Sequence, residues 1–413
     1  MKSLSLFALT LACGVSLLRA NETLAVVPDS ASALGMAGGR YANVGDPAAV
    51  RTNPANILTL DAPAFEVNVG AWYGDINFTT PTGQSEKMGA PWKYLGSAYY
   101  VEPIKPGETA WGLGISTPYG ISSEWPQDGP LKYLIPYKSS LLTVDLTPAF
   151  AFKVGDLSVG IGMELMYSDL KLQQLFPWSL LVGHPVMDGN FVLDGDGFGV
   201  GGFLGLNWEP VKGQRFALVG RLPLSISYSG DFTANNLPGA AHAMGFTSTS
   251  SFDSSFRYPG SIAAGYGWDV TDRFTLGFDA MWAANSSQQQ LPLLIGRDQA
   301  LLGRQSVPFN WRNSWEGGFG AQYKINESWK LRAGYLYASA SQPDETFNPA
   351  VASNERHMLT IGAGWSGKKD TVDIALSYLI YPDRTITDNV QPGFDGRYSI
   401  QWYVVSLSYT HKF

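Results

Sequence analysis

The chain has 413 residues, a formal net charge of −7 at pH 7, 13% aromatic and only 15% charged residues. An acidic chain is not expected to bind nucleic acid, and beyond residue 18 no apolar run is long enough for a membrane-spanning helix. Soluble domains carry about 25% charged residues, so low charge, many aromatics and a mean hydropathy of −0.05 favour apolar residues that alternate with small polar ones.

The pattern of residues 1–20 predicts a secretory signal peptide. One lysine supplies the positive region, and the apolar stretch over 4–18 is too short for a confident transmembrane helix. Cleavage is expected after Ala20, with Ala25 as a second candidate. The single cysteine, Cys13, lies in the apolar stretch, so the mature chain has no disulfide. Removing two basic residues and no acid lowers the net charge from −7 to −9.

Residues 21–62 have no strand period and are mostly small and polar, as in "PDSASALGMAGGRYANVGDPAAVRTNPANI". A wide barrel encloses a lumen that its own side chains cannot fill. We therefore expect this segment to fold back as a hatch that plugs the lumen of the strands that follow. A mobile periplasmic tail is the alternative.

From residue 63 to 413 apolar and polar residues alternate with the period of a strand. The run "LLTVDLTPAFAFKV" and the run "LSVGIGMELMYSD" are separated only by Gly155-Asp156, which predicts a tight hairpin. These runs exceed the usual strand length of about 5 or 6 residues and suit a tilted membrane span. The candidate strands lie near residues 64–77, 92–102, 109–120, 139–154, 157–170, 197–209, 214–232, 256–268, 272–285, 311–325, 328–340, 356–366, 371–382 and 398–413.

The connections between these strands alternate between short and long. Short periplasmic turns and long extracellular loops interleave in this way in an outer-membrane barrel, whereas a soluble sandwich has no reason to sort its loops by length. The sequence thus predicts an all-β fold: a 14-stranded antiparallel transmembrane β-barrel over 63–413 in the bacterial outer membrane, plugged by the hatch over 21–62. The terminal aromatic residue, Phe413, resembles the end that barrel assembly machinery recognises.

No catalytic or ligand-coordinating pattern is present in the sequence. The four histidines belong to no hydrolase or metal-binding motif; they are His184, His242, His357 and His411. We therefore expect neither an enzyme nor a metal or other cofactor.

One predicted extracellular loop, "LQQLFPWSLLVGHPVM", is unusually apolar. Exposed apolar patches usually mark binding sites, so we expect this loop to capture a hydrophobic ligand. The alternative is a loop that folds inward and packs on itself. The candidate capture residues are Leu175, Phe176, Trp178, Leu180 and Leu181.

Several stretches resemble the FadL-type long-chain fatty acid transporter family of outer membranes, which includes aromatic-hydrocarbon uptake proteins. "SALGMAGGRYANVGDPAAVRTNPANILTL" is similar to the family's hatch, with its small-Leu-Gly-x-Ala element, Asp46 and the triplet Asn53-Pro54-Ala55. "WGLGISTPYGISSEW" resembles the third strand and its Pro-x-Gly exit, and "TPAFAFKVGDLSVGIGM" resembles the hairpin that follows. The resemblance covers nearly the whole mature chain in order.

The resemblance implies passive uptake of long-chain fatty acids or other hydrophobic compounds by a monomer, with lateral exit through the wall. It places Asn53 against the ligand; the alternative is that Asn53 only caps the turn into the first strand. We expect Leu24, Val26 and Val27 to add apolar wall to the same pocket. A general diffusion porin or a structural outer-membrane barrel is the alternative function.

Two further positions follow from the resemblance. Pro118 and Gly120 interrupt the third strand, because Pro lacks a donor and Gly weakens a strand, and they are the expected lateral gate. An ordinary strand end is the alternative. Fatty-acid members carry a basic residue at the extracellular end of the fifth strand, where alignment places Asp169, with Lys171 two residues on. An acid there would repel a carboxylate, so the substrate could instead be neutral.

Overall fold

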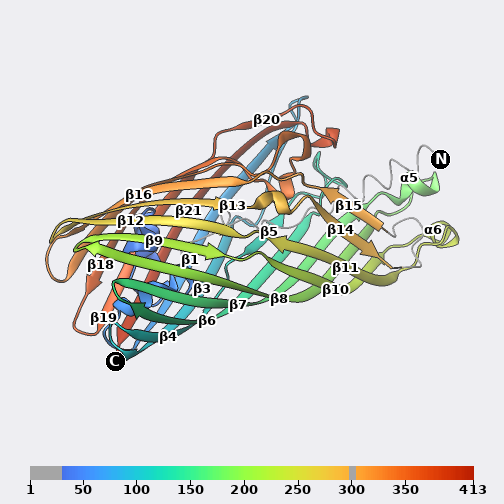
Figure 1. Cartoon of the computed structure of the whole chain (residues 1–413). Helices are drawn as coiled ribbons and strands as arrows, with labels where there is room; N and C mark the ends of the chain where they lie inside the picture. The colour runs from blue at the N-terminus through green and yellow to red at the C-terminus, as the bar shows by residue number, and fades with distance from the viewer. Residues whose placement is uncertain (1–29, 297–303) are drawn as a thin grey trace.

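The computed structural model describes residues 30–296 and 304–413. In these ranges the chain forms one closed antiparallel barrel (Figure 1). No helix in the described ranges is long and apolar enough to cross a membrane. The predicted signal peptide and the predicted pocket residues Leu24, Val26 and Val27 lie outside the described residues.

The wall contains fourteen strands, five of which are interrupted, so the predicted 14-stranded barrel is confirmed. In chain order they are β1 (Ala64–Thr79), β3 (Trp92–Lys105), β4 (Thr109–Ser116) with β5 (Gly120–Glu124), β6 (Lys138–Val154), β7 (Leu157–Phe176), β8 (Gly189–Val211), β9 (Gln214–Arg221) with β10 (Leu224–Asn235), β11 (Thr249–Tyr258) with β12 (Ser261–Thr271), β13 (Phe274–Ala283) with β14 (Gln290–Ile295), β15 (Arg304–Pro308) with β16 (Ser314–Lys324), β17 (Trp329–Ala338), β18 (Arg356–Ser366), β19 (Asp370–Ile380) and β21 (Gly396–Lys412).

The first and last strands close the ring. β1 pairs with β3 on one side and with β21 on the other, from Ala64↔Lys412 to Thr79↔Arg397. Outward residues of these strands, such as Val69, are apolar and exposed, while inward residues are buried. That pattern is the one expected when lipid covers the outside of a barrel.

Short turns gather at one end of the barrel, the periplasmic end, beside the C-terminus (Figure 1). The extracellular end carries the longer connections. They include α5 (Trp178–Val182), α6 (Gly239–Ala243), the short strands β2 (Ser85–Lys87) and β20 (Arg384–Ile386), and the 3-10 turns η3 (Asn285–Ser287), η4 (Asp344–Thr346), η5 (Pro349–Val351) and η6 (Pro392–Phe394).

The strands around the apolar loop are longer than the sequence predicted. β7 continues to Phe176 and β8 begins at Gly189, so the predicted loop over 171–196 shrinks to a short connection. The two strands stay paired to Phe176↔Gly189. The ladder extends this far because the alternation of inward and outward residues continues beyond the membrane-facing band.

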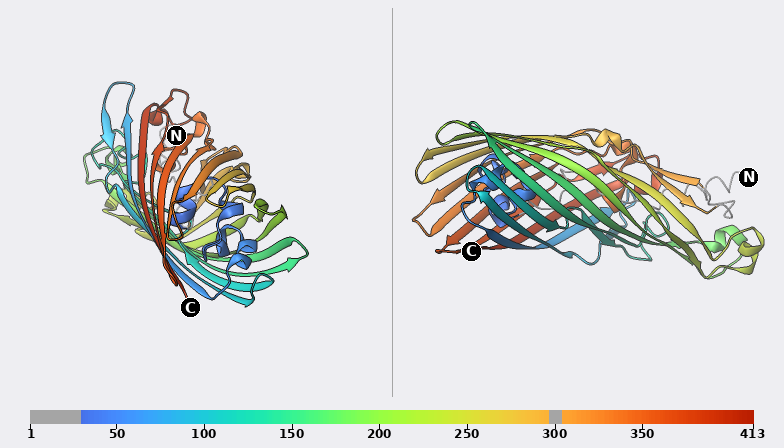
Figure 2. Two further views of the ribbon diagram at one scale, coloured as in Figure 1. Left: turned by 90° about the vertical axis from the view of Figure 1, so that its left-hand side faces the viewer. Right: turned by 60° about the horizontal axis from the view of Figure 1, so that its bottom comes forward.

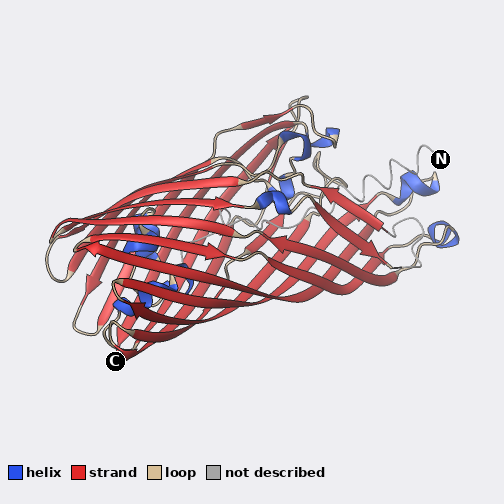
Figure 3. Ribbon diagram, viewed as in Figure 1, coloured by secondary structure: helices blue, strands red, loops and turns tan. Residues whose placement is uncertain are grey.

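The N-terminal segment, residues 30–60, lies inside the ring of strands (Figure 2 and Figure 3). It contains α2 (Ala31–Met36), α3 (Arg40–Asn43), α4 (Ala49–Thr52) and η2 (Pro54–Thr59). α2 packs on β17, β18 and β19, whereas η2 packs on β6, β7 and β8. The segment therefore spans the lumen from one wall to the other.

Glycines in the wall allow the N-terminal segment to approach closely. A Cβ atom on Gly320 or on Gly334 would overlap the carbonyl oxygen of Met36, at the end of α2. A Cβ atom on Gly160 would overlap the backbone at Ala55. Backbone therefore packs directly on backbone at these contacts.

Candidate functional site

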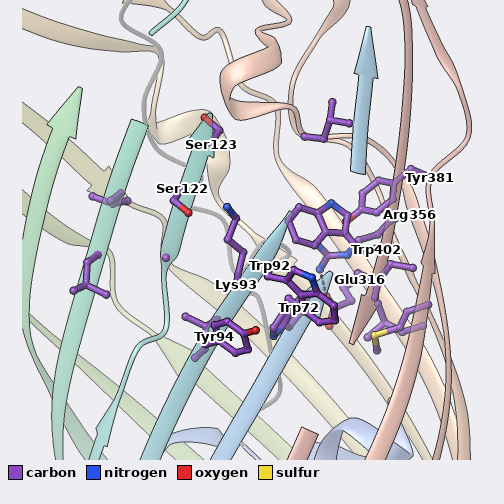
Figure 4. Close-up of a pocket in the computed structure, with 18 of the residues that line it drawn as sticks. Trp72, Trp92, Lys93, Tyr94, Ser122, Ser123, Glu316, Arg356, Tyr381 and Trp402 are labelled. Carbon is purple, nitrogen blue, oxygen red and sulfur yellow. Dashed lines mark ion pairs between the residues drawn. The ribbon is translucent and has the colours of Figure 1, made fainter. Parts of the chain in front are cut away.

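A cavity of about 430 Å³ lies in the lumen on the extracellular side of the N-terminal segment. Trp72 and Trp402 supply part of its apolar wall (Figure 4), together with Ile76. Arg40 and Arg51 of the N-terminal segment supply part of its floor. The cavity thus combines an apolar wall with a charged floor, the combination typical of sites for small amphipathic ligands.

The aromatic wall follows from the inward phase of β1 and β21. Trp72 is buried, whereas the next residue, Tyr73, points outward, as alternation requires. Trp72 meets Trp402 edge to face, with ring centroids 6.3 Å apart. Gly74 makes room for the indole of Trp402, because a Cβ atom there would overlap the ring.

One part of the charged floor joins α3 to the wall strands β13, β16 and β18. The Arg40 guanidinium lies 2.5 Å from Glu316 Oε1 and 3.3 Å from Asp279 Oδ2, and the Arg40 backbone N–H donates to Asp279 over 2.8 Å. Arg356 lies 3.6 Å from the other oxygen of Glu316. These buried charges neutralise each other, as buried charges must.

A second part joins α4 to the strands β6, β7 and β9. Arg221 lies 2.8 Å from Glu164 and donates to the Arg51 carbonyl oxygen over 2.7 Å. The Arg51 guanidinium lies 3.7 Å from Asp145 and 3.9 Å from Glu164. Two arginines and two carboxylates therefore hold the end of α4 against the wall.

The wall beside the cavity is interrupted between β3 and β5. β3 pairs with β4 from Ser97↔Ser116 onward, but no pairing joins Trp92–Gly96 to β5. β4 ends before Thr117-Pro118, and the wall resumes at Gly120, which lines the cavity. The predicted gate residues thus lie beside a real gap in the ladder. Their role in opening the wall stays a prediction.

Lys93 lies at this gap. It projects between the indole rings and the short strand that carries Ser122 and Ser123 (Figure 4). Its ammonium group donates to the Ala90 carbonyl oxygen over 2.6 Å. Among the cations that line the cavity within the described ranges, Lys93 alone makes no ion pair.

The structure places Asn53 away from this cavity. Its side chain is fully buried and accepts from the Ala55 N–H, which caps η2. Its amide nitrogen donates to the carbonyl oxygens of Tyr41 and Leu206 at 2.8 and 3.2 Å. This geometry favours the capping alternative over contact with a ligand, because every polar atom of the side chain is already engaged.

The apolar loop is divided between packing and exposure. Phe176 and Trp178 are buried in a cluster of aromatic rings, with Phe176 to Phe191 and Trp178 to Phe246 centroids 4.6 and 5.2 Å apart. Leu181 packs at the edge of that cluster, while Leu180 remains 70% exposed. The inward-packing alternative therefore describes the two aromatic residues better than a capture surface does.

Asp169 does not face the lumen. Ser168 and Leu170, its neighbours on β7, are buried, and Ser168 pairs with Tyr228 across the interior over 2.9 Å. Asp169 points outward beside Lys171, which pairs with Asp194. The expectation of an acid that repels a carboxylate in the pocket was wrong, because strand alternation puts residue 169 on the other face.

Sequence reasoning also missed most of the cavity lining. One of the missed residues is Arg221, which the structure places in the floor. A signal was available: Asp145 and Glu164 sit at inward positions of long strands, and the N-terminal segment carries Arg40 and Arg51. Opposite charges on a wall and on its plug are expected to pair.

Comparison with known proteins places this geometry in context. A family model described as "Outer membrane protein transport protein (OMPP1/FadL/TodX)" matches residues 15–413. The chain is 26% identical to the "Long-chain fatty acid transport protein" of Escherichia coli O6:H1, with 85% of each chain covered. It is also 26% identical to the "47 kDa outer membrane protein" of Pasteurella multocida, with 92% of each covered.

Two solved structures share the fold. A FadL homologue of Pseudomonas aeruginosa superposes with a TM-score of 0.81 at 21% identity, covering 94% of this chain and 99% of that one. The toluene transporter TodX of Pseudomonas putida superposes with a TM-score of 0.77 at 19% identity, covering 93% and 98%. At these identities the likeness concerns the arrangement of the strands.

Proposed function

This chain belongs to the outer membrane protein transport protein (OMPP1/FadL/TodX) family, and from that premise we propose that it takes up apolar molecules with an acidic headgroup. Its relatives include proteins named for long-chain fatty acid transport and for toluene transport. The observation that carries the proposal is a lumen cavity that continues into a gap in the wall.

The route has three stages. Exposed apolar residues at the extracellular end, such as Leu180, receive the molecule. The cavity above the N-terminal segment holds it, and the gap between β3 and β5 releases it sideways into the bilayer. The N-terminal segment acts as the hatch, since it occupies the lumen that a diffusion porin would leave open. Passage needs no covalent step, because apolar molecules partition into lipid spontaneously.

Lys93 supports an acidic headgroup over a neutral one. The arginines of the floor already pair with wall carboxylates, whereas among the described residues the partner of the Lys93 ammonium is a backbone carbonyl. A ligand carboxylate can replace that contact with a stronger, charge-assisted hydrogen bond. The indole rings beside it suit the first carbons of an alkyl chain.

The test is a competition experiment on the purified barrel in detergent. We expect saturable binding of a fluorescent long-chain fatty acid that unlabelled fatty acid displaces and a neutral aromatic hydrocarbon does not. Lys93→Met should weaken binding by about tenfold or more, the value of one charge-assisted hydrogen bond. Lys105→Met, at an exposed ion pair near the periplasmic turn, is the matched control.

The outcomes separate the parts of the proposal. Displacement by the neutral hydrocarbon with no effect of Lys93→Met would replace the acidic ligand by a neutral one. Absence of saturable binding for either class would refute the transport proposal itself. Gly120→Phe places a ring at the gap and should slow uptake by cells. Because Gly120 also lines the cavity, binding in detergent is measured on the same variant to separate a blocked exit from a filled cavity.

A further inference from the structure

A second hollow lies on the outer face of the barrel, away from the lumen. Its volume is about 700 Å³, which falls within the range of ligand pockets. Exposed apolar side chains of β7, β8 and β12 border it, together with Leu222, which is 66% exposed. The bordering side chains of the three strands are Ile161, Met163, Leu204 and Ile262.

The hollow lies where two neighbouring strands of the wall are both interrupted. Leu222-Pro223 separates β9 from β10, and directly opposite, Pro259-Gly260 separates β11 from β12. The ladder pairs Arg221↔Ser261 and Leu224↔Tyr258, but the residues between them are unpaired. The outward position Gly220 leaves open space, with nothing within 4 Å of where its Cβ would lie.

Arg221 separates this hollow from the lumen cavity. Among the described residues it alone lines both. Its guanidinium pairs with Glu164 and lies 4.2 Å from the ring centroid of Phe203. A paired, buried cation is costly to move, so the hollow is a separate site open to the membrane rather than an extension of the transport route.

The position of the hollow identifies the leaflet that covers it. β12 runs from the hollow at Gly260 to the periplasmic turn after Thr271, so the hollow lies toward the extracellular end of the wall. Ile262 at its border pairs with Trp282, and tryptophan favours the membrane interface. Lipid of the outer leaflet therefore covers this part of the wall.

A cation and a hydroxyl mark the extracellular rim of the hollow. Arg257 is exposed there, and in the described ranges no carboxylate lies within ion-pair distance of it. Its backbone N–H donates to Gln288 Oε1 over 3.0 Å, which fixes the rim beside Ser287. A guanidinium next to a hydroxyl suits a phosphate, which arginine binds with two parallel hydrogen bonds.

We propose that this hollow is a binding site for lipopolysaccharide, with one acyl chain of its lipid anchor over Gly220 and a phosphate on Arg257. The apolar border accounts for the chain, and the exposed guanidinium of Arg257 at the rim accounts for the anion. Such a lipid would cover the place where the two proline breaks meet, because Leu222-Pro223 and Pro259-Gly260 form no ladder pair with each other.

The test measures lipid retained by the intact barrel. Protein purified from outer membranes is incubated with lipid A or with phosphatidylethanolamine, washed in detergent and examined by native mass spectrometry. We expect one retained lipid A per barrel. Gly220→Leu, which fills the hollow, and Arg257→Gln, which removes the cation, should each reduce that retention by about tenfold, a loss on the scale of one charge-assisted hydrogen bond. Gly317→Leu, another outward glycine with open surroundings, is the control.

Several results would overturn the assignment. Retention of lipid A that neither variant changes would place the lipid elsewhere on the wall. Equal retention of phosphatidylethanolamine, whose phosphate can also meet a guanidinium, would show that the hollow does not select lipopolysaccharide. Sensitivity to Gly220→Leu without sensitivity to Arg257→Gln would exclude the proposed phosphate contact. Fatty-acid binding in the lumen cavity should be unchanged in both variants, so failure here leaves the transport proposal untouched.

Discussion

The lumen is filled by ion pairs at its periplasmic end and by aromatic rings at its extracellular end. The N-terminal segment presents Arg40 and Arg51 to inward carboxylates of four wall strands, β6, β7, β13 and β16. The aromatic cluster, centred on Trp178, Phe176 and Phe246, packs ring against ring. The two ends therefore respond differently when a contact is lost.

The difference concerns what can replace a broken contact. A buried ion pair contributes little net stability, but removal of one partner leaves an uncompensated charge that draws in water. An apolar cluster that loses a ring leaves a dry cavity, which another apolar molecule can fill. Loss of a contact should therefore let water in at the periplasmic end but leave a dry cavity at the extracellular end.

The largest effect is expected from Arg40→Ala. This change leaves Asp279 buried without its arginine partner, while Glu316 keeps the more distant Arg356 at 3.6 Å. It should destabilise the packing of α3 on the wall by about 3–5 kcal/mol. Water and ions should then pass the N-terminal segment, so single-channel conductance in planar bilayers should rise. Arg397→Ala, which breaks an exposed pair with Asp383, is the control and should leave conductance unchanged. Equal conductance in both variants would contradict a sealing role for the buried pair.

A smaller, local effect is expected from Trp178→Ala. Trp178 is fully buried, and its loss should destabilise the aromatic cluster by about 3 kcal/mol. No charged group loses an ion-pair partner in this change. Hydrogen exchange should therefore accelerate in α5 and α6 while conductance stays at the wild-type level. Leu180→Ala, at an exposed position on the same helix, should change neither quantity. A rise in conductance with Trp178→Ala would contradict the proposed difference between the two ends of the lumen.

The strand period predicted the wall well because it reports a physical alternation between lipid and lumen. Residues 157, 159, 161, 163, 165 and 167 share one face in the sequence, and the structure turns that face outward. The same alternation puts Asp169 outside, although alignment to the family had suggested the pocket. The local period was the better guide, because one residue of alignment error exchanges the two faces of a strand.

The cavity was less predictable, because its residues meet only through closure of the ring. Lys93 on β3 and Arg221 on β9 are adjacent to the same space but share no local pattern. Asn53 could not be placed from sequence either, since its amide binds carbonyl oxygens of Tyr41 and Leu206, one of them 153 residues away. The sequence alone does not show whether the hydrogen-bonding groups of such a polar side chain bind the protein backbone or a ligand.

Gly320→Ala tests, by steric overlap alone, whether the close packing of the N-terminal segment on the wall is required. The new methyl group would overlap the Met36 carbonyl oxygen and should displace α2 at a cost of about 1–3 kcal/mol. The barrel should still fold, but a protease should cleave the N-terminal segment faster. Gly317→Ala, on the same strand with no atom closer than 3.9 Å, is the matched control. Identical cleavage of the two variants would show that the close approach is not required.

The smallest effect concerns pH at the extracellular end. Burial raises the pKa of Glu86 on β2 to about 7, against the hydrogen bond that its carboxylate accepts from the Leu131 N–H over 3.0 Å. Because this pKa is higher in the folded state than in the unfolded chain, the stability that protonated Glu86 contributes is present below about pH 4.5 and is lost as pH rises through about 7.

Glu86→Gln should remove this dependence, because an amide of the same shape does not titrate. After correction for intrinsic exchange rates, protection of the Leu131 amide should fall with rising pH in the wild type. Glu86 is buried, but its neighbours on β2 are exposed to water, which weakens the effect, and we expect a change of less than about tenfold. The variant should give a flat profile over the same range. A parallel slope in both proteins would assign the pH response to another group, whereas a flat profile in both would show that the loop is insensitive to this carboxyl group.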